Sequence, residues 1–222
     1  MNVGDTPEFS IPRAHVAQLG IAKRVIGEDK FQREIAFVCG VDVAYTDDWA
    51  FSVAVTLDYA TLSILEIQSA HQKVKFPYIP TLLAFRELPA AVSCIRKLKL
   101  KPDVFLVDGH GKAHPYGCGL ASHLGVVLGM TTIGVAKRKL IGEVKQLDGN
   151  VFLVYEGKVV GAQVTTLENA KPVYVSVGHL VSLETAVKIV KHCSPAVRIP
   201  EPIRLAHTIA SRERKAKIAL LH

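Results

Sequence analysis

Residues 37–44 read Phe-Val-Cys-Gly-Val-Asp-Val-Ala, and residues 104–109 read Val-Phe-Leu-Val-Asp-Gly. Both are short apolar runs rich in β-branched residues, which is typical of buried strands, and each carries an aspartate, Asp42 or Asp108. An ionised carboxylate in such a run costs free energy unless a cation lies beside it. If the two strands are neighbours, the two aspartates predict an oxygen-rich site for a divalent metal ion such as Mg²⁺ or Mn²⁺.

Each acid also has a purely structural interpretation. Asp42 could accept hydrogen bonds from local amides at a bulge beside Gly40, and Asp108, which precedes a glycine-rich loop, could cap a turn or a helix. Glu87 could be a third ligand, although a solvated helical glutamate paired with Arg86 is the ordinary role of such a residue taken alone. We prefer the metal site because ligands gather at the carboxyl ends of parallel strands, where several acids would meet.

Length and composition are those of one compact globular unit. The chain has 222 residues, of which 49% are apolar and 21% charged, so we expect a single catalytic domain over residues 1–222 and no extended disorder. The formal net charge of +7 and the pI near 9.2 favour binding to polyanions, nucleic acid among them. We expect the protein to act as a monomer.

The sequence also bears on the compartment. The four cysteines are widely spaced without a C-x-x-C pair, which favours reduced thiols over disulfides or a zinc site. The first residues lack the arrangement of a signal peptide, and the most apolar stretch, 120–136, is interrupted by glycines and polar residues. We therefore expect a cytoplasmic protein that is neither secreted nor membrane-spanning.

The order of the expected elements gives the fold class. Apolar residues at helical spacing (Val16, Leu19, Ile21 and Val25) predict an amphipathic helix over 13–30. Strands are predicted at 35–44, 50–57, 61–67, 104–107 and 132–135, with a hairpin at 151–155 and 158–165. Further helices are predicted at 82–98, 119–128 and 182–192, and Pro200 and Pro202 open a last helix that runs through 204–220. The result is an α/β fold whose central mixed sheet, three antiparallel strands and then parallel strands, is flanked by helices.

A short loop at 76–80 reads Phe-Pro-Tyr-Ile-Pro. Its two prolines, Pro77 and Pro80, stiffen the backbone and hold Tyr78 and Ile79 at the tip. A rigid apolar tip can wedge between bases and unstack them. The alternative is a loop that Tyr78 pins onto the protein core.

Three further residues have side chains suited to phosphodiester chemistry. His114 could move a proton, Lys137 could hold the attacking water or a phosphate, and His207 could reach the same site from the last helix. Each could equally be a polar loop or surface residue. The basic end of the last helix is a candidate for contacts with a phosphate backbone.

Several ordered motifs resemble the endonuclease V family. The resemblance rests on residues 40–45, 76–80 leading into 83–87, 107–111 through 114–115 to 121–125, 133–137 and 172–179. It spans nearly the whole chain in the same order. It implies an RNase H-like fold and a metal-dependent endonuclease that recognises hypoxanthine (deaminated adenine) in DNA or inosine in RNA, and nicks at the second phosphodiester 3′ to the lesion.

The resemblance also assigns roles to residues of this chain. It implies that Asp42 and Asp108 bind the catalytic Mg²⁺ and that Glu87 completes the acidic centre. His114, Lys137 and His207 match positions at the active site. The segment Pro77, Tyr78, Ile79 and Pro80 matches a strand-separating wedge, and Gly109 and Gly111 match the lining of a pocket that takes the flipped base.

Rival functions are less consistent with these residues. Nucleases of the RNase H-like class that cut RNA–DNA hybrids or junctions lack the Pro77–Pro80 tip in this form. A nucleic-acid-binding module without activity would gain nothing from carboxylates facing phosphates. A sugar-kinase-like phosphotransferase would need a phosphate loop of the form G-x-x-x-x-G-K-[ST], which the sequence does not contain.

Overall fold

The computed structural model describes residues 10–147 and 149–219. In chain order its elements are α1 (Ile11–Ala22), β1 (Phe37–Tyr45), β2 (Trp49–Asp58), β3 (Ile64–Lys73), α2 (Leu83–Ile95), β4 (Val104–Asp108), α3 (Leu120–Leu128), β5 (Thr132–Ala136), β6 (Glu143–Leu147), β7 (Asn150–Tyr155), β8 (Lys158–Val164), β9 (Val173–His179), α4 (Leu183–His192) and α5 (Glu201–Ala219). Within these residues the strands form one sheet in the order β3-β2-β1-β4-β5-β9-β8-β7-β6.

The sheet is mixed, as predicted. Strands β1, β2 and β3 are antiparallel neighbours, and β1 pairs in parallel with β4, which pairs in parallel with β5. Beyond β5 the antiparallel pairing of β7 with β8 confirms the predicted hairpin. The strands β9 and β6 differ from the parallel pairing predicted for the second half of the sheet, because β9 is antiparallel to β5 and β8, and β6 is antiparallel to β7. Short turns join β6, β7 and β8, and such turns can only reverse the chain. At the predicted β7–β8 turn, Glu156 and Gly157 both have positive φ, as a two-residue hairpin requires.

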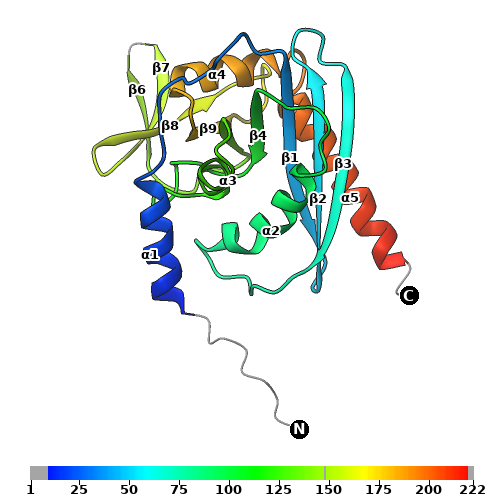
Figure 1. Ribbon diagram of the computed structural model, residues 1–222. Helices are drawn as coiled ribbons and strands as arrows, with labels where there is room; N and C mark the ends of the chain where they lie inside the picture. The colour runs from blue at the N-terminus through cyan, green and yellow to red at the C-terminus, as the bar shows by residue number, and fades with distance from the viewer. Residues whose placement is uncertain (1–9, 148, 220–222) are drawn as a thin grey trace.

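Helices cover both faces of this sheet (Figure 1). Helices α2 and α3 pack on one face, and α4 and α5 pack on the other. Side chains alternate along each strand, so the sheet separates two apolar cores. Val38 of β1 and Leu106 of β4 face α5, whereas Val41 and Val107 face α2 and α3. This arrangement confirms the predicted RNase H-like α/β fold.

The N-terminal helix differs from its prediction. Helix α1 covers Ile11–Ala22 rather than 13–30, and the predicted apolar face is wrong, because Val16 and Leu19 are exposed. Instead, α1 packs on α3 through Ala14 and Gln18. Gln18 is fully buried because its amide donates hydrogen bonds to the carbonyl oxygens of Thr81 and Cys118.

The last helix approaches β1 very closely at Gly40. A Cβ atom placed on Gly40 would lie 2.1 Å from the carbonyl carbon and oxygen of Pro202, so only glycine allows this contact. Helix α5 begins at Glu201, between the two prolines predicted to open it, and the predicted final residue, Leu220, lies outside the described residues. Among the helices in the described part of the chain, none has the length and apolarity needed to cross a membrane.

Candidate active site

The strand register brings Asp42 and Asp108 together. Val41 of β1 pairs with Val107 of β4, so each aspartate follows a paired residue by one position on adjacent parallel strands. Alternation along the strands directs both carboxylates to the face that α5 covers. The two acids that the sequence singled out therefore meet at one edge of the sheet.

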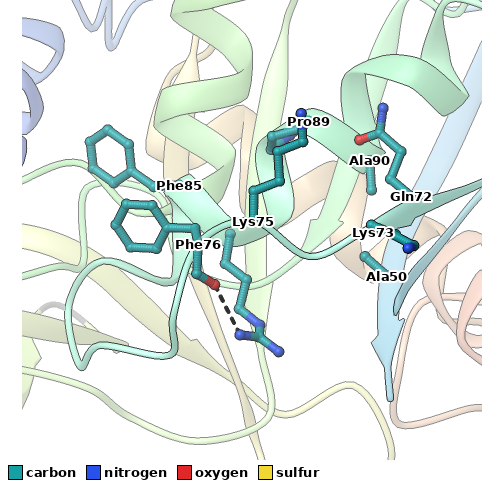
Figure 2. A pocket seen from close by; sticks show the side chains of 9 residues that line it. Ala50, Gln72, Lys73, Lys75, Phe76, Phe85, Pro89 and Ala90 are labelled. Carbon is teal, nitrogen blue, oxygen red and sulfur yellow. Dashed lines mark hydrogen bonds between the residues drawn. The ribbon is translucent and has the colours of Figure 1, made fainter. Parts of the chain in front are cut away.

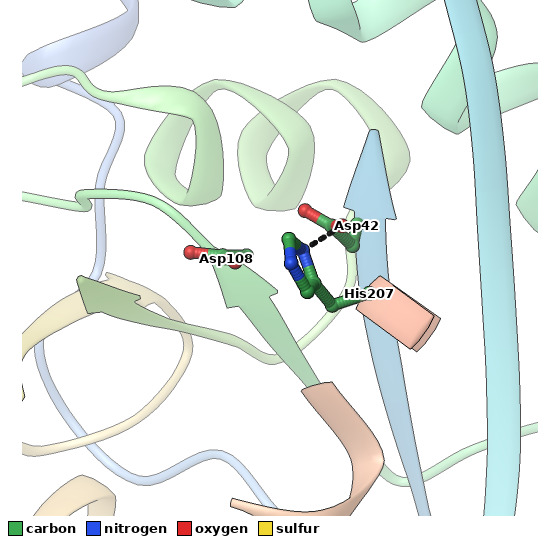
Figure 3. Close-up of side chains that lie close together, drawn as sticks. All are labelled: Asp42, Asp108 and His207. Carbon is green, nitrogen blue, oxygen red and sulfur yellow. Dashed lines mark hydrogen bonds and ion pairs between the residues drawn. The ribbon is translucent and has the colours of Figure 1, made fainter. Parts of the chain in front are cut away.

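Helix α5 adds His207 to the pair (Figure 3). Between the contact at Pro202 and His207 the helix rises about 7 Å, and β1 advances about the same distance from Gly40 to Asp42. The His207 Nδ1 lies 2.9 Å from Asp42 Oδ2. One ligand atom from each of Asp42, Asp108 and His207 can be chosen so that all lie within 4.8 Å of one another.

Lys137 holds the second aspartate. Asp108 pairs with Val135 of β5, and Lys137 follows the end of that strand, so its side chain can reach back along the sheet. The Lys137 Nζ lies 2.7 Å from Asp108 Oδ2. Each aspartate thus has its own side-chain partner, Lys137 for Asp108 and His207 for Asp42, which fixes the orientation of its carboxylate.

Glu87 reaches the centre from the opposite face of the sheet. It belongs to α2, is only 8% exposed, and lines one cavity of about 390 Å³ together with Asp42, Asp108 and His207. The Tyr45 ring, which lines the same cavity, lies beside it. The structure therefore brings together Asp42, Glu87, Asp108, Lys137 and His207.

Two acids of this centre, Asp42 and Glu87, hold their protons more tightly than they would in water. Burial, together with the negative charge of Asp108, raises the pKa of Asp42 above its ordinary value, although His207 opposes the shift. Burial raises the pKa of Glu87 to about 8. Both shifts reflect the cost of concentrating negative charge in a site that water reaches poorly, and a bound cation would relieve that cost.

A second cleft, of about 300 Å³, adjoins the acids. Its walls come from the predicted wedge loop, from α2 and from the loop after β4; they include Tyr78, Ile79, Pro80, Thr81, Leu83, Ala84, Glu87, Asp108, Gly109, His110, His114, Gly119, Leu120 and Leu140. Tyr78 is 69% exposed at the rim, which contradicts the alternative that it pins the loop onto the core. We call this second cleft the recognition cleft, and we call the cavity lined by Asp42, Glu87, Asp108 and His207 the acidic cavity. The two are adjoining compartments, because Glu87 and Asp108 line both of them.

Three predicted residues take different places around the recognition cleft. Gly109 lines it, with a φ of 155° that favours glycine. Gly111 is not among the lining residues, because it packs against the backbone of Val177, where a Cβ would lie 2.1 Å from the carbonyl oxygen. His114 lines the cleft rather than the cluster of metal ligands, and burial lowers its pKa to about 4, which favours a neutral ring.

A third cleft lies on the other side of α2 (Figure 2). It measures about 240 Å³, and Phe76 and Phe85 stack at one end of it with ring centroids 5.6 Å apart. Lys73 and Lys75 line it as well. Arg86, which donates a hydrogen bond to the Phe76 carbonyl and lies over the Tyr45 ring, separates this cleft from the acidic cavity.

Among the lining residues, Thr81, Leu140 and Ser211 were not candidates from the sequence, and Arg214 was one only as part of the basic end of the last helix. Thr81 and Leu140 line the recognition cleft, and Ser211 and Arg214 line the acidic cavity. Thr81 and Leu140 carry no local signal. Ser211 and Arg214 follow His207 by four and seven residues, which is the spacing of one helical face, so that signal was available once His207 was chosen.

Comparisons with known proteins point to one family. The family model for endonuclease V matches residues 19–208. Endonuclease V from Thermofilum pendens is 47% identical over 214 residues, covering 95% of this chain and 92% of that protein. The crystal structure of endonuclease V from Streptomyces avermitilis is 38% identical with a TM-score of 0.87, covering 94% of this chain and 95% of the other.

A third comparison is with a protein–DNA complex. Ciona intestinalis endonuclease V, crystallised with a 24mer DNA that contains an inosine followed by a ribo-adenosine, is 33% identical with a TM-score of 0.83, covering 93% of this chain and 98% of the other. Relatives at this identity and coverage, and a family model that matches most of the chain, leave one conclusion. The chain belongs to the endonuclease V family and is an endonuclease.

Proposed function

We propose that this endonuclease is a metal-dependent repair enzyme of the cytoplasm that recognises hypoxanthine and hydrolyses the second phosphodiester 3′ to it. The products would carry 3′-hydroxyl and 5′-phosphate ends. The observation that carries the proposal is the shared wall of Glu87 and Asp108 between the acidic cavity and the recognition cleft. Support comes from the relative from Ciona intestinalis, which was crystallised with inosine-containing DNA.

The residues present fit a divalent cation. Two carboxylates and an imidazole offer ligand atoms within 4.8 Å of one another, and both aspartates come from rigid strands. Asp42 and Asp108 would hold the ion, with Mg²⁺ favoured by their oxygen ligands and Mn²⁺ also suited. When bound, such an ion supplies Lewis-acid polarisation of the phosphate and lowers the pKa of water.

The protein's own residues prepare this chemistry. His207 and Lys137 each hold one oxygen of an aspartate and so fix the direction of its other lone pairs. Lys137 is partly exposed, so its ammonium can also donate to a phosphate oxygen beside Asp108. Glu87 has a pKa raised to about 8 in the absence of a cation, and a cation bound beside it would favour its ionised form, which can accept a proton within the same cavity.

Recognition of the lesion would use the wedge and the recognition cleft. Unstacking a base costs a few kcal/mol, and less at an inosine pair than at a sound pair, so a wedge favours the lesion. Tyr78 is exposed at the tip and Pro77 and Pro80 stiffen the loop on either side of it. The cleft behind the loop offers apolar walls and the backbone of Gly109 to a flipped base.

A second candidate is an endoribonuclease that acts on inosine in RNA. The ribo-adenosine after the inosine in the strand bound to the Ciona intestinalis relative favours it. The 2′-hydroxyl is what distinguishes RNA from DNA at such a site. The two candidates share the acidic centre and the recognition cleft.

One cleavage assay separates these possibilities. Matched strands with one deoxyinosine, one riboinosine or no lesion are incubated with Mg²⁺, Mn²⁺ or excess chelator, and the ends of the products are mapped. We expect nicking only of the inosine strands, at the second phosphodiester, and only with metal. Asp108→Ala or Asp42→Ala should abolish nicking while strand binding persists. Turnover by the wild type in excess chelator would refute the metal mechanism.

A further inference from the structure

The acidic cavity has one wall that the proposed chemistry does not use. Ser211 and Arg214 line it on the α5 side, and they follow His207 on the same helical face. Arg214 is half-buried, and its Nε is buried without a hydrogen-bond partner among the described residues. A guanidinium N–H without an acceptor costs free energy, so the protein alone does not satisfy Arg214, whose side chain lines a cavity that a ligand can enter.

The other basic side chains around the cavity already have partners. Lys137 pairs with Asp108, His207 contacts Asp42, and Arg86 bonds the Phe76 carbonyl. Within the described part of the chain, Arg214 makes no ion pair with the carboxylates. A cation that lines an acidic cavity but pairs with none of its acids is available to an anion that enters from outside.

Helix α5 holds this arginine in a defined place. The neighbouring Glu213 carboxylate lies 2.8 Å from the ring of His71 on β3, and Lys217 lies over the ring of Trp49 on β2, 5.0 Å from its centroid. These contacts fix the turn of α5 that carries Arg214 against the antiparallel half of the sheet. A preorganised guanidinium presents its donors to a phosphate at little entropic cost.

The order of the compartments identifies which phosphate meets it. Of these two compartments, the wedge residues Tyr78, Ile79 and Pro80 line only the recognition cleft, and Ser211 and Arg214 line only the acidic cavity. Glu87 and Asp108 line both. A strand with its flipped base in the cleft and its scissile phosphate at the acids next reaches α5. Because the proposed cut lies 3′ to the lesion, the strand leaves in the 3′ direction.

We infer that Ser211 and Arg214 form a subsite for the phosphodiester group immediately 3′ of the scissile bond. The direction of the strand rests on the proposed function, whereas the binding of a phosphodiester at Arg214 does not. The rival exit leads past Arg86 into the cleft of Lys73 and Lys75 (Figure 2). That exit would leave Arg214 without a phosphate.

The test combines protein variants with DNA strands in which one phosphodiester at a time is replaced by an uncharged linkage. Single strands carry one inosine and one methylphosphonate, placed in turn at each of the four linkages around the expected cut. Dissociation constants are measured by fluorescence anisotropy with Ca²⁺ replacing Mg²⁺, and gels verify that the strands stay intact. The variants are Arg214→Ala, Arg214→Lys, Lys75→Ala and Arg212→Ala; the last removes an equal charge from an exposed position outside the cavity.

We expect Arg214→Ala to weaken binding at least about tenfold and to lower the salt slope by about one. A neutral linkage 3′ of the cut should weaken the wild type but not Arg214→Ala, and Arg214→Lys should retain part of the effect. A linkage couples to a residue when neutralising that linkage weakens binding by the wild type but not by the variant that lacks the residue. The inference is overturned if no linkage couples to Arg214, if Arg212→Ala gives the same coupling as Arg214→Ala, or if the 3′ linkage couples only to Lys75.

The same measurements separate this inference from the proposed function. A wild type that binds inosine and lesion-free strands equally, yet keeps the coupling between Arg214 and one linkage, contradicts lesion recognition and supports the phosphate subsite. A coupling that appears 5′ of the cut refutes the assigned direction. A wild type that binds no strand refutes both proposals.

Discussion

Replacing Gly40 with alanine should damage the active site from a distance. A Cβ at this position would lie 2.1 Å from the Pro202 carbonyl and 2.6 Å from the backbone nitrogen of Ile203. Ordinary contact begins near 3.4 Å, so α5 must move outward by about 1.3 Å. The helix carries His207, whose Nδ1 lies 2.9 Å from Asp42, and a movement of that size would break this contact.

Two magnitudes follow for Gly40→Ala. Overpacking at a core position typically costs about 1–3 kcal/mol of stability. Displacing a group in an active site by about 1 Å can cost about 100-fold in rate. We therefore expect a modest loss in the free energy of unfolding, measured by urea denaturation, and a loss near 100-fold in the single-turnover rate of nicking.

The matched control is Gly20→Ala in α1. An added Cβ there meets no atom within 4 Å, and alanine favours a helix over glycine by about 0.5–1 kcal/mol. The control should be at least as stable as the wild type and equally active. If Gly40→Ala retains the rate within about twofold while folding normally, the close packing of α5 does not position His207 and the reasoning is refuted.

Three further predictions concern single side chains. Tyr78→Ala should lower the preference for inosine over adenine duplexes about tenfold and leave nicking of single strands unchanged, because only a duplex needs the wedge; unchanged duplex discrimination would contradict this role. In excess chelator at pH 8, the Tm of Glu87→Gln should exceed that of the wild type by at least about 4 °C, whereas at pH 4.5 it should not exceed it. The reason is that Glu87, with its pKa near 8, keeps its proton in the folded state while the unfolded chain has lost it, so wild-type stability falls between these pH values; parallel melting curves would disprove it. Asp103→Ala should cost about 1–3 kcal/mol at pH 7, because Asp103 accepts bonds from Arg33 and from two backbone amides before and at the start of β1. Although burial opposes it, these bonds lower the pKa of Asp103, so the difference in urea stability should shrink below about pH 4, and a difference independent of pH would refute the assignment.

The centre of the fold could be predicted from the sequence because its signals are local. The runs around Asp42 and Asp108 are apolar, short and β-branched, and their period of two also decides which face each side chain takes. The strand β9 carries the same kind of signal, since Val173, Val175 and Val177 alternate and are buried, yet it was not among the predicted strands. The strand β9 could therefore have been predicted from the sequence.

Other features depend on partners that no local pattern reveals. The strand β6 reads Glu-Val-Lys-Gln-Leu, and every one of its residues is exposed. It has no buried face, and its sequence accordingly lacks a regular alternation of apolar and polar side chains. Gln18 is buried in α1 only because two distant carbonyls accept its amide protons. Within the site, Glu87 looks like a surface glutamate until α2 is packed on the sheet, and Arg214 cannot be told from Arg212 without the position of α5.

The wall that the two compartments share has a consequence for the chemistry of repair. Glu87 and Asp108 belong to a helix and a strand of the core, so the spacing between the base that is read and the bond that is cut is built into the rigid interior. Under the proposed function, the enzyme therefore cuts at a fixed distance from the base that it recognises. It marks the damaged strand with a break but leaves the damaged nucleotide in the chain, one nucleotide from the new 3′ end, and a separate excision reaction must remove it.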